Sequence, residues 1–433
     1  MKKSILIFVF LAMIVAITSA ARATNGDNMI AIGPIARSMG GVGVAAPQDA
    51  ISAVFANPAS MCFAPFCNAT TFDFAGTLFM PKVDAKQITA SGGIVQADSD
   101  DKVYAIPAIG LSVPINDTFP SWRFGIAAYG VSGLGVDYRG TNLDNPTAFM
   151  GNPLIAGEYT NLQIMKFAPA VAVQALDNLS LGMAIHVDYA NLDLRDGSSP
   201  NYGYGLQAGL IYTLTDKITF GTSYITAQTV KHKNITDFDW NGALDDLELE
   251  APQQVGFGVA YTILDPANLV IEADAKWLNW SDAKGYKDFD WDDQWVYAIG
   301  VQFKPTDRLT FRVGYNYGKN PLKEHEGFDG TFQTVGAQVL PNSVRTVQGA
   351  TLPTYYYETF RIIGFPAIVE QHLTLGLGIQ VTDDFSVNIG YMQAFEETIS
   401  QTGTTGLDLM TEPVTLESTL SETSLEFGLT WLF

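Results

Sequence analysis

The sequence predicts an all-β protein, a transmembrane antiparallel β-barrel of about 14 strands with an N-terminal hatch, or plug, segment. Three observations predict this fold. A secretory signal opens the chain, amphipathic stretches of about 10 residues follow one another to its end, and the connections between them are alternately short and long. The chain thus divides into a signal peptide over 1–23, a hatch over 24–67 and a transmembrane barrel over 68–433.

The first residues have the pattern of a cleaved signal peptide. Lys2 and Lys3 precede an apolar run from Ile5 to Ile17. Ala21-Arg22-Ala23 then supplies the small residues of a cleavage site, so the mature chain would begin at Thr24. No later stretch approaches the roughly 20 consecutive apolar residues of a transmembrane helix. A membrane location therefore requires a closed barrel, because an open sheet edge in lipid leaves backbone groups unpaired.

The composition fits a barrel whose outer surface faces lipid. Of 433 residues, 12% are aromatic, only 16% are charged and 40 are glycine. A soluble protein of this size would carry more charge. The net charge of -21 argues against a nucleic acid partner and against a polybasic segment that binds membrane surfaces.

The stretch from Ala36 to Met61 is unlike a barrel strand. Several glycines loosen its backbone, and apolar residues then recur at helical spacing until Asn57-Pro58 ends the run. Small residues would let such a segment pass close to a barrel wall, so we interpret it as a plug. The alternative is an ordinary loop and helix packed on a β domain.

Two cysteines, Cys62 and Cys67, follow this stretch. Export to an oxidising compartment predicts a local disulfide between them, with two free buried thiols as the alternative. Their spacing matches no metal site.

Leu179 to Tyr189 shows the strand pattern that recurs along the chain. Its odd positions are apolar or aromatic, and its even positions are small or polar. The same alternation occurs in 255–263, 295–303, 309–317 and 373–381. A soluble β-sandwich also alternates, but many such strands with aromatic residues near their ends favour an outer-membrane barrel.

The connections distinguish a barrel from a sandwich. Short turns rich in Asp, Asn or Pro lie at 176–178, 215–217, 265–268, 305–307 and 382–384. Long polar loops alternate with them, at 82–102, 137–159, 231–250, 281–293, 319–365 and 396–420. An up-and-down barrel with tight periplasmic turns and extended outer loops gives this alternation, whereas a Greek-key sandwich does not require it.

The last strand, Leu425 to Phe433, alternates and ends on an aromatic residue. This ending is typical of bacterial outer-membrane proteins, whose assembly machinery reads it. We therefore expect the barrel-assembly machinery to recognise Phe433, and outer-membrane lipid and lipopolysaccharide to surround the barrel.

The order of motifs along the chain resembles one family. A signal peptide is followed by the sequence Ala36-Arg37-Ser38-Met39-Gly40-Gly41-Val42-Gly43, by Asp49, by Val54-Phe55-Ala56-Asn57-Pro58-Ala59 and by the predicted barrel. This order resembles the FadL-type outer-membrane transporters for long-chain fatty acids and aromatic hydrocarbons. The resemblance covers the whole mature chain, and its hatch residues are Arg37, Gly40, Gly41, Gly43, Asp49, Asn57, Pro58 and Ala59.

This resemblance implies a channel for hydrophobic compounds without a cofactor. Outer loops would capture a fatty acid or an aromatic hydrocarbon, which would diffuse to a site near the N-terminus and leave laterally beside a kinked third strand. The loops match no particular member, so the substrate stays open. The alternative is a non-transporting barrel that acts as an anchor or assembly partner for secreted proteins, since such a protein would keep the same hatch and strands.

The third strand by this count is Trp122 to Tyr138. Gly130, Gly133 and Gly135 would weaken its pairing and permit a bulge or kink, which makes them candidates for the lateral exit. The alternative is a plain barrel strand that contains glycines.

Apolar residues in the outer loops are candidates for a capture groove. Phe149, Met150, Leu154 and Ile155 lie between two Asn-Pro pairs. The alternative is that they bury one another beneath the loop. Tyr355, Tyr356, Tyr357 and Phe360 pose the same choice, with an aromatic girdle as a third possibility.

Charged residues at inward positions predict ion pairs that fill the lumen, or a basic group that holds a fatty-acid carboxylate. These positions include His186, Asp188, Glu272, Asp274, Lys276 and Arg312. Acidic runs at 237–250 and 288–293 could bind cations that bridge lipopolysaccharide, but the second run lacks the glycine and distal glutamate of an EF-hand. We expect solvated loop charge there and no metal site.

The sequence gives little support for catalysis. None of its 4 histidines lies in a nucleophile or metal motif, and there is no Gly-x-Ser-x-Gly or P-loop pattern. We expect no catalytic residues and no cofactor.

Overall fold

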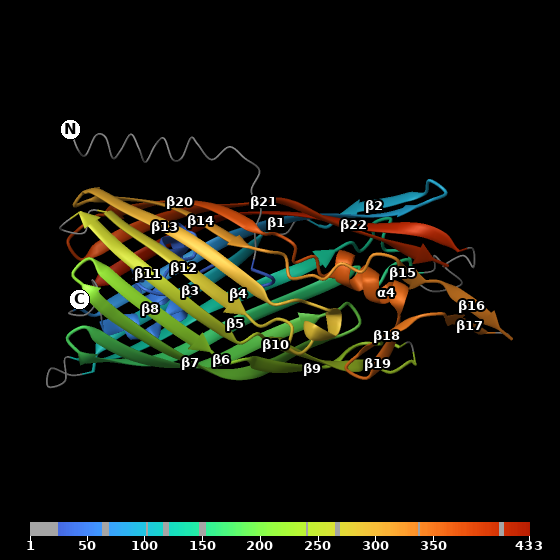
Figure 1. Ribbon diagram of the computed structural model, residues 1–433, viewed down its shortest axis with the longest axis horizontal. Coiled ribbons are helices and arrows are strands. Elements are labelled where there is room, and N and C mark those ends of the chain that lie inside the picture. The colour runs from blue at the N-terminus through green and yellow to red at the C-terminus, as the bar shows by residue number, and fades with distance from the viewer. Residues whose placement is uncertain are drawn as a thin grey trace.

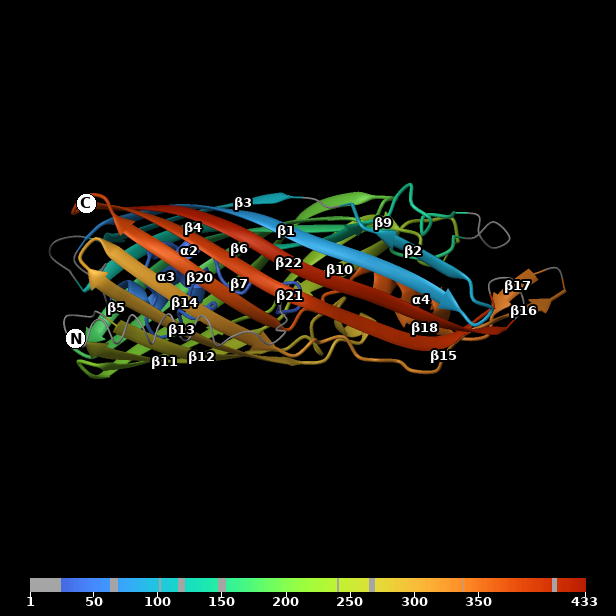
Figure 2. The same ribbon diagram turned by 90° about the horizontal axis from the view of Figure 1, so that it is seen from above.

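Strands form most of the computed structural model, which describes residues 25–62, 69–100, 103–115, 121–146, 153–239, 241–264, 269–336, 338–406 and 411–433 (Figures 1 and 2). They build the predicted closed 14-strand antiparallel barrel. Its strands are β1 (Thr71–Thr89), β3 (Tyr104–Pro114), β4 (Trp122–Asp137), β5 (Tyr159–Leu176), β6 (Leu179–Asp193), β7 (Ser198–Thr215), β8 (Ile218–Ile225), β11 (Gln254–Leu264), β12 (Leu269–Leu278), β13 (Gln294–Thr306), β14 (Leu309–Gly318), β20 (Gln371–Gln380), β21 (Phe385–Thr405) and β22 (Glu412–Leu432).

Each barrel strand pairs with its neighbours, and the first strand closes the barrel against the last, with Thr71 of β1 opposite Leu432 of β22. The period of two decides which side chains face out. In β6, Met183 and Ile185 are about half exposed on the outer face, at 55% and 54%, whereas Ala184 and His186 are buried inside. Apolar residues therefore cover the outside of the barrel, as the alternation predicts.

The two ends of the barrel differ. One, the turn end, carries the short connections and Phe433 (Figure 1). The other, the loop end, carries β2 (Ile94–Asp98), β9 (Gln228–Thr236), β10 (Asp245–Ala251), η3 (Lys287–Phe289), β15 (Phe328–Gly330), β16 (Phe332–Val335), β17 (Gln338–Pro341), β18 (Val344–Val347), β19 (Ala350–Pro353), α4 (Thr354–Thr359) and η4 (Phe360–Gly364). No helix among the described residues is long and apolar enough to cross a membrane.

Residues 25–62, here called the luminal segment, lie inside the barrel, with α2 and α3 nearer its turn end (Figure 2). The segment contains α2 (Pro34–Arg37), α3 (Ala50–Ala56) and η1 (Pro58–Cys62). Wall alanines pack against Ile51 and Val54 of α3. A second core, rich in aromatic residues, fills the loop end around α4 and η4.

Candidate functional site

Glycines on the inner wall make room for the luminal segment. A Cβ atom on Gly314 of β14 would lie 2.0 Å from the Gly40 nitrogen, and one on Gly221 of β8 would lie 1.9 Å from the Val44 carbonyl oxygen. Both distances are too short for any side chain. Other wall glycines that closely approach the segment are Gly110, Gly125, Gly182, Gly209, Gly300, Gly376 and Gly428.

Two of the predicted hatch glycines are required by their backbone conformation. Gly40 and Gly41 have φ values of 72° and 85°, which side-chain-bearing residues rarely adopt. A Cβ on Gly41 would also lie 2.6 Å from the Ile30 carbonyl oxygen. The turn between α2 and α3 thus depends on glycine at both positions.

Asp49 and Asn57 fix the two ends of α3. The Asp49 carboxylate accepts a 2.6 Å hydrogen bond from the Ser52 N–H and caps the helix. The Asn57 side-chain amide donates to the Val44 and Leu210 carbonyl oxygens, at 2.7 and 3.1 Å. Asn57 therefore joins two parts of the luminal segment to β7. After it, the motif residues Pro58 and Ala59 begin η1.

Charged wall residues hold the backbone of the luminal segment. Asp274 accepts hydrogen bonds from the N–H groups of Gly43 and Val44, at 2.9 and 3.1 Å. Glu272 likewise accepts two from residues 45–46, at 2.8 and 3.0 Å, and Lys276 donates to the Gly41 carbonyl oxygen at 2.8 Å. These groups were expected to fill the lumen as ion pairs. They instead bind the backbone N–H and C=O groups that the turn leaves unpaired.

Among the cavities lined by described residues, three follow one another from the loop end to the luminal segment. The outer cavity, of about 170 Å³, is lined by Ile155, Tyr356 and Phe360 among others. An aromatic cavity shares Leu194 and Phe360 with it. The luminal cavity, of about 70 Å³, shares Tyr286 with the aromatic cavity. The shared side chains make the three cavities neighbours in a row.

Five of the 11 residues that line the aromatic cavity are aromatic. Phe289 stacks on Phe360 with 4.8 Å between ring centroids, and Tyr286 meets Trp291 edge to face at the same distance. Phe365, several leucines, Gly285 and Arg361 complete the lining. Of these residues, only Phe360 was a candidate from the sequence.

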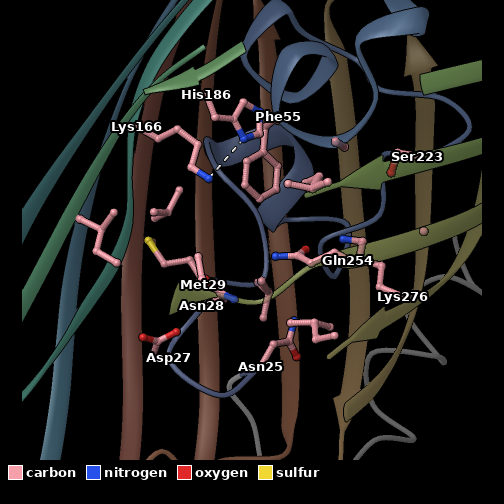
Figure 3. Close-up of a pocket in the computed structure, with 18 of the residues that line it drawn as sticks. Asn25, Asp27, Asn28, Met29, Phe55, Lys166, His186, Ser223, Gln254 and Lys276 are labelled. Atoms are coloured by element: carbon pink, nitrogen blue, oxygen red, sulfur yellow. Dashed lines mark hydrogen bonds between the residues drawn. The ribbon is translucent and has the colours of Figure 1, made fainter. Parts of the chain in front are cut away.

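The luminal cavity is more polar (Figure 3). Lys166 of β5 points into it, with its Nζ atom 3.4 Å from His186 Nδ1 and 3.5 Å from Asp188 Oδ1. Phe55 of α3 lies beside His186, and residues 25 and 27–30 also line the cavity. The cavity thus lies between the luminal segment and the wall.

A contact between Asp27 and Tyr286 lies at the boundary between the luminal and aromatic cavities. The Tyr286 hydroxyl donates to the buried Asp27 carboxylate, and both side chains line the luminal cavity. Burial raises the pKa of Asp27 to about 6, although the hydrogen bond from Tyr286 lowers it. Neither residue lies in a motif, so the sequence alone does not indicate them.

The third barrel strand, β4, contains a β-bulge. Gly130 lies opposite Met165 and Ser132 opposite Ile164, so Val131 is the extra residue. The Val131 carbonyl oxygen accepts a 3.1 Å hydrogen bond from the Met29 N–H. The bulge is thus bonded to the luminal segment.

Pairing between β3 and β4 stops just before this bulge, at Ala108 opposite Tyr129. Beyond it, residues 104–107 pair with β1, and residues 130–137, which include Gly133 and Gly135, pair with β5. A backbone bond from Asp100 to Asp137, 2.9 Å long, joins the two sides again. Between these points, no backbone hydrogen bond joins β3 to β4 among the described residues. We call this stretch the β3–β4 gap.

The predicted groove residues are only partly described. Ile155 is buried and lines the outer cavity, and Leu154 packs against the loop-end core. Phe149 and Met150 lie outside the described residues. The tyrosines at 355–357 are buried, and their hydroxyl groups donate to carbonyl oxygens of loop residues 153, 154 and 288. They therefore hold loops together and form no outer girdle.

Cys62 is buried, forms no disulfide with another described residue, and has its Sγ atom 3.4 Å from the Ser121 carbonyl oxygen. Its predicted partner Cys67 lies outside the described residues, so the disulfide stays a prediction.

One loop could hold a cation. Oxygen atoms of Asp237, Asp239 and Asp245 lie within 4.8 Å of one another. Asp237 and Asp239 belong to the sequence Asp-Phe-Asp-Trp-Asn-Gly, whose acidic and glycine spacing is that of an EF-hand loop, and Asp245 follows it. The glutamate at the distal position, Glu248, instead pairs with Lys284 at 2.6 Å, so the ligand set of an EF-hand is incomplete.

Known proteins share this architecture. The structure is similar to the toluene transporter TodX of Pseudomonas putida (TM-score 0.63, 18% identity, 93% of this chain and 99% of that chain). It is also similar to a Pseudomonas aeruginosa FadL homologue (TM-score 0.63, 15% identity, 95% of this chain and 99% of that chain). A third similar structure is the Ralstonia pickettii toluene transporter TbuX (TM-score 0.60, 15% identity, 93% of this chain and 98% of that chain). No curated protein sequence matches the chain.

The model of the outer membrane protein transport protein family (OMPP1/FadL/TodX) matches residues 12–201 and 196–327, which is more than half of the chain. This family consists of transporters and channels. The chain belongs to the outer membrane protein transport protein family, and it is a bacterial outer-membrane barrel that transports hydrophobic compounds.

Proposed function

We propose that the protein takes up small aromatic compounds by passive diffusion, from the outer cavity through the aromatic cavity to the luminal cavity. The row of three cavities with shared walls carries this proposal. A greasy solute is poorly solvated by the polar saccharide layer of the outer membrane, and an apolar route avoids that cost.

Aromatic compounds suit the aromatic cavity better than long alkyl chains do. Its rings present both faces and edges, and offset or edge-to-face contacts with a substrate ring add about 0.5–1.5 kcal/mol to simple burial. The toluene transporters TodX and TbuX have the same fold. Long-chain fatty acids are the second candidate, because Lys166 and Lys276 line the luminal cavity.

Lateral exit through the β3–β4 gap completes the proposed route. Val131, the extra residue of the bulge, lines the luminal cavity. On the other edge of the gap, the Ile106 side chain occupies the space next to Gly130, where a Cβ atom on Gly130 would lie 2.5 Å from it. A solute could leave here for the lipid without breaking backbone pairing between β3 and β4. The luminal segment would then act as a plug that blocks direct passage to the periplasm.

A reversible cross-link tests the exit. We would place cysteines at Ile106 and Gly130, in a background where Cys62 and Cys67 are serine. Uptake of labelled toluene and oleate would be measured in cells that lack their own hydrophobic transporter. Oxidation should stop uptake, and a reductant should restore it. The control pair, Leu111→Cys with Ile126→Cys, joins residues that already face each other in paired backbone and should change little.

Surface assembly would be checked for each variant. Uptake that persists with the Ile106–Gly130 link formed would contradict lateral exit but not transport. No uptake of either compound by correctly assembled wild-type protein would favour a barrel that serves as an anchor for secreted proteins.

A further inference from the structure

A row of polar side chains crosses the inner wall at the luminal cavity. Tyr129 of β4 is the register partner of Lys166 of β5, and Lys166 is the partner of Asp188 of β6. All three line the cavity, and Tyr129 immediately precedes the bulge. A substrate that reaches the β3–β4 gap from the luminal cavity would therefore pass this row.

Two members of the row have unused hydrogen-bonding capacity. Tyr129 and Asp188 are 0% and 1% exposed, and among the described residues neither the Tyr129 hydroxyl nor Asp188 Oδ1 has a hydrogen-bond partner. Asp188 Oδ1 forms an ion pair with Lys166 Nζ, at 3.5 Å. The Asn28 side-chain nitrogen, which also lines the cavity, has no hydrogen-bond partner in the described part of the chain either. The cavity thus offers hydrogen-bond donors beside an acceptor.

These groups discriminate between ligands. A pure hydrocarbon returns no hydrogen bond to these groups and leaves them unpaired, which is costly for buried polar groups. A carboxylate would face the negative charge of Asp188. The two lysines of the cavity do not offset this repulsion. Lys166 is already paired with Asp188, and Lys276 binds the Gly41 carbonyl oxygen and lies near the Asp274 carboxylate. A hydroxyl group both donates and accepts, so it satisfies the site without adding charge.

We propose that the luminal cavity recognises a hydroxyl group, and that the preferred substrates are hydroxylated aromatic compounds of the phenol type. This inference rests on the proposed uptake of aromatic compounds and narrows it. The rings around the aromatic cavity contact the substrate ring along the route, and the polar row from Tyr129 to Asp188 binds the hydroxyl group before the substrate reaches the gap.

Three probes with one ring test the proposal: toluene, 4-methylphenol and 4-methylbenzoate. Binding to the purified full-length barrel in detergent would be measured by calorimetry. Micelles take up each probe to a different extent, so each is compared between wild type and the Tyr129→Phe variant, which removes one hydroxyl group and keeps the ring. The background from the micelles cancels in that ratio.

The Tyr129→Phe variant should bind 4-methylphenol about tenfold more weakly, as expected for the loss of one hydrogen bond in a buried site, and should bind toluene as well as wild type does. Tyr138→Phe is the matched control. Tyr138 is also 0% exposed with an unpartnered hydroxyl group, but it does not line the luminal cavity. The Tyr138→Phe variant should bind both toluene and 4-methylphenol as well as wild type does. Asp188→Asn should strengthen the binding of 4-methylbenzoate, because it removes the repelling charge.

Equal effects of Tyr129→Phe on toluene and 4-methylphenol, or no effect on either, would overturn the hydroxyl site while leaving aromatic uptake intact. An equal loss of 4-methylbenzoate and 4-methylphenol binding in the Tyr129→Phe variant would overturn it in favour of an anion site. Failure of a folded barrel to bind any of the three probes would overturn the uptake of aromatic compounds as well.

Discussion

Arg37 of the luminal segment and Glu426 of the last barrel strand form a buried ion pair, with 2.9 Å between Arg37 Nε and Glu426 Oε1, although 389 residues separate them. Arg37 also donates to the Ser424 hydroxyl at 3.0 Å. Strand β22 closes the barrel by pairing with β1. The Arg37–Glu426 ion pair therefore attaches the luminal segment to the strand that closes the barrel.

Loss of the arginine should therefore destabilise the whole protein. Arg37→Met leaves the Glu426 carboxylate buried without its cation, and we expect a loss of about 3–5 kcal/mol in the free energy of unfolding. Urea unfolding of the barrel in lipid vesicles measures this change in the free energy of unfolding. The double variant Arg37→Met with Glu426→Gln should recover most of the loss. A single variant as stable as wild type would show that the pair does not support the fold.

The wall glycines predict a second stability effect. Gly221→Ala places a methyl group where the Val44 carbonyl oxygen lies, so we expect a loss of about 1–3 kcal/mol from overpacking. Gly76→Ala on β1 is the control, because a Cβ atom there meets nothing within 4 Å. The same urea titration compares the two variants. Equal stability of both would mean that the luminal segment can shift away from the wall at little cost.

The barrel could be predicted from the sequence because its signals are local. Alternation with a period of two, turn residues and the order of short and long connections each occupy a few adjacent positions. The end of α3 at Asn57-Pro58 is local in the same way. These features need no knowledge of which strand lies beside which.

The cavities could not be predicted, because they depend on register between strands. Tyr129, Lys166 and Asp188 become neighbours only when the pairing of β4, β5 and β6 is known. The same limit explains the error about Glu272 and Asp274. Their inward direction was predictable, but their partners are backbone N–H groups more than 200 residues earlier in the chain.

Asp27 predicts a pH dependence in the docking of residues 25–30. Burial raises its pKa in the folded protein from 3.8 to about 6. The folded state therefore binds the proton more tightly, so docking is favoured at low pH and weakens as pH rises through about 6. Hydrogen exchange of residues 25–30 should accelerate between pH 5 and pH 7.5, after correction for its intrinsic pH dependence. Asp27→Asn, which stays neutral, should remove the acceleration, and an unchanged profile in that variant would exclude Asp27 as its source.

A buried glutamate at the loop end predicts a different local effect. Glu358 of α4 accepts hydrogen bonds from His325, Arg361 and Gln401, at 2.8, 2.7 and 2.8 Å. Burial alone would raise the pKa of Glu358, but the interactions with His325 and Arg361 outweigh burial and lower this pKa. The stability that the Glu358 carboxylate contributes is therefore present at neutral pH and is lost as pH falls below about 4.5. Glu358→Gln keeps the shape and removes the charge. At pH 7 we expect hydrogen exchange in α4 and η4 to become about tenfold faster or more, because each charged hydrogen bond lost is worth about 1.5–3 kcal/mol. Exchange in the barrel strands should stay unchanged, because the lost hydrogen bonds are local to the loop end. Equal acceleration throughout the barrel would show instead that the loop end and the barrel unfold as one unit.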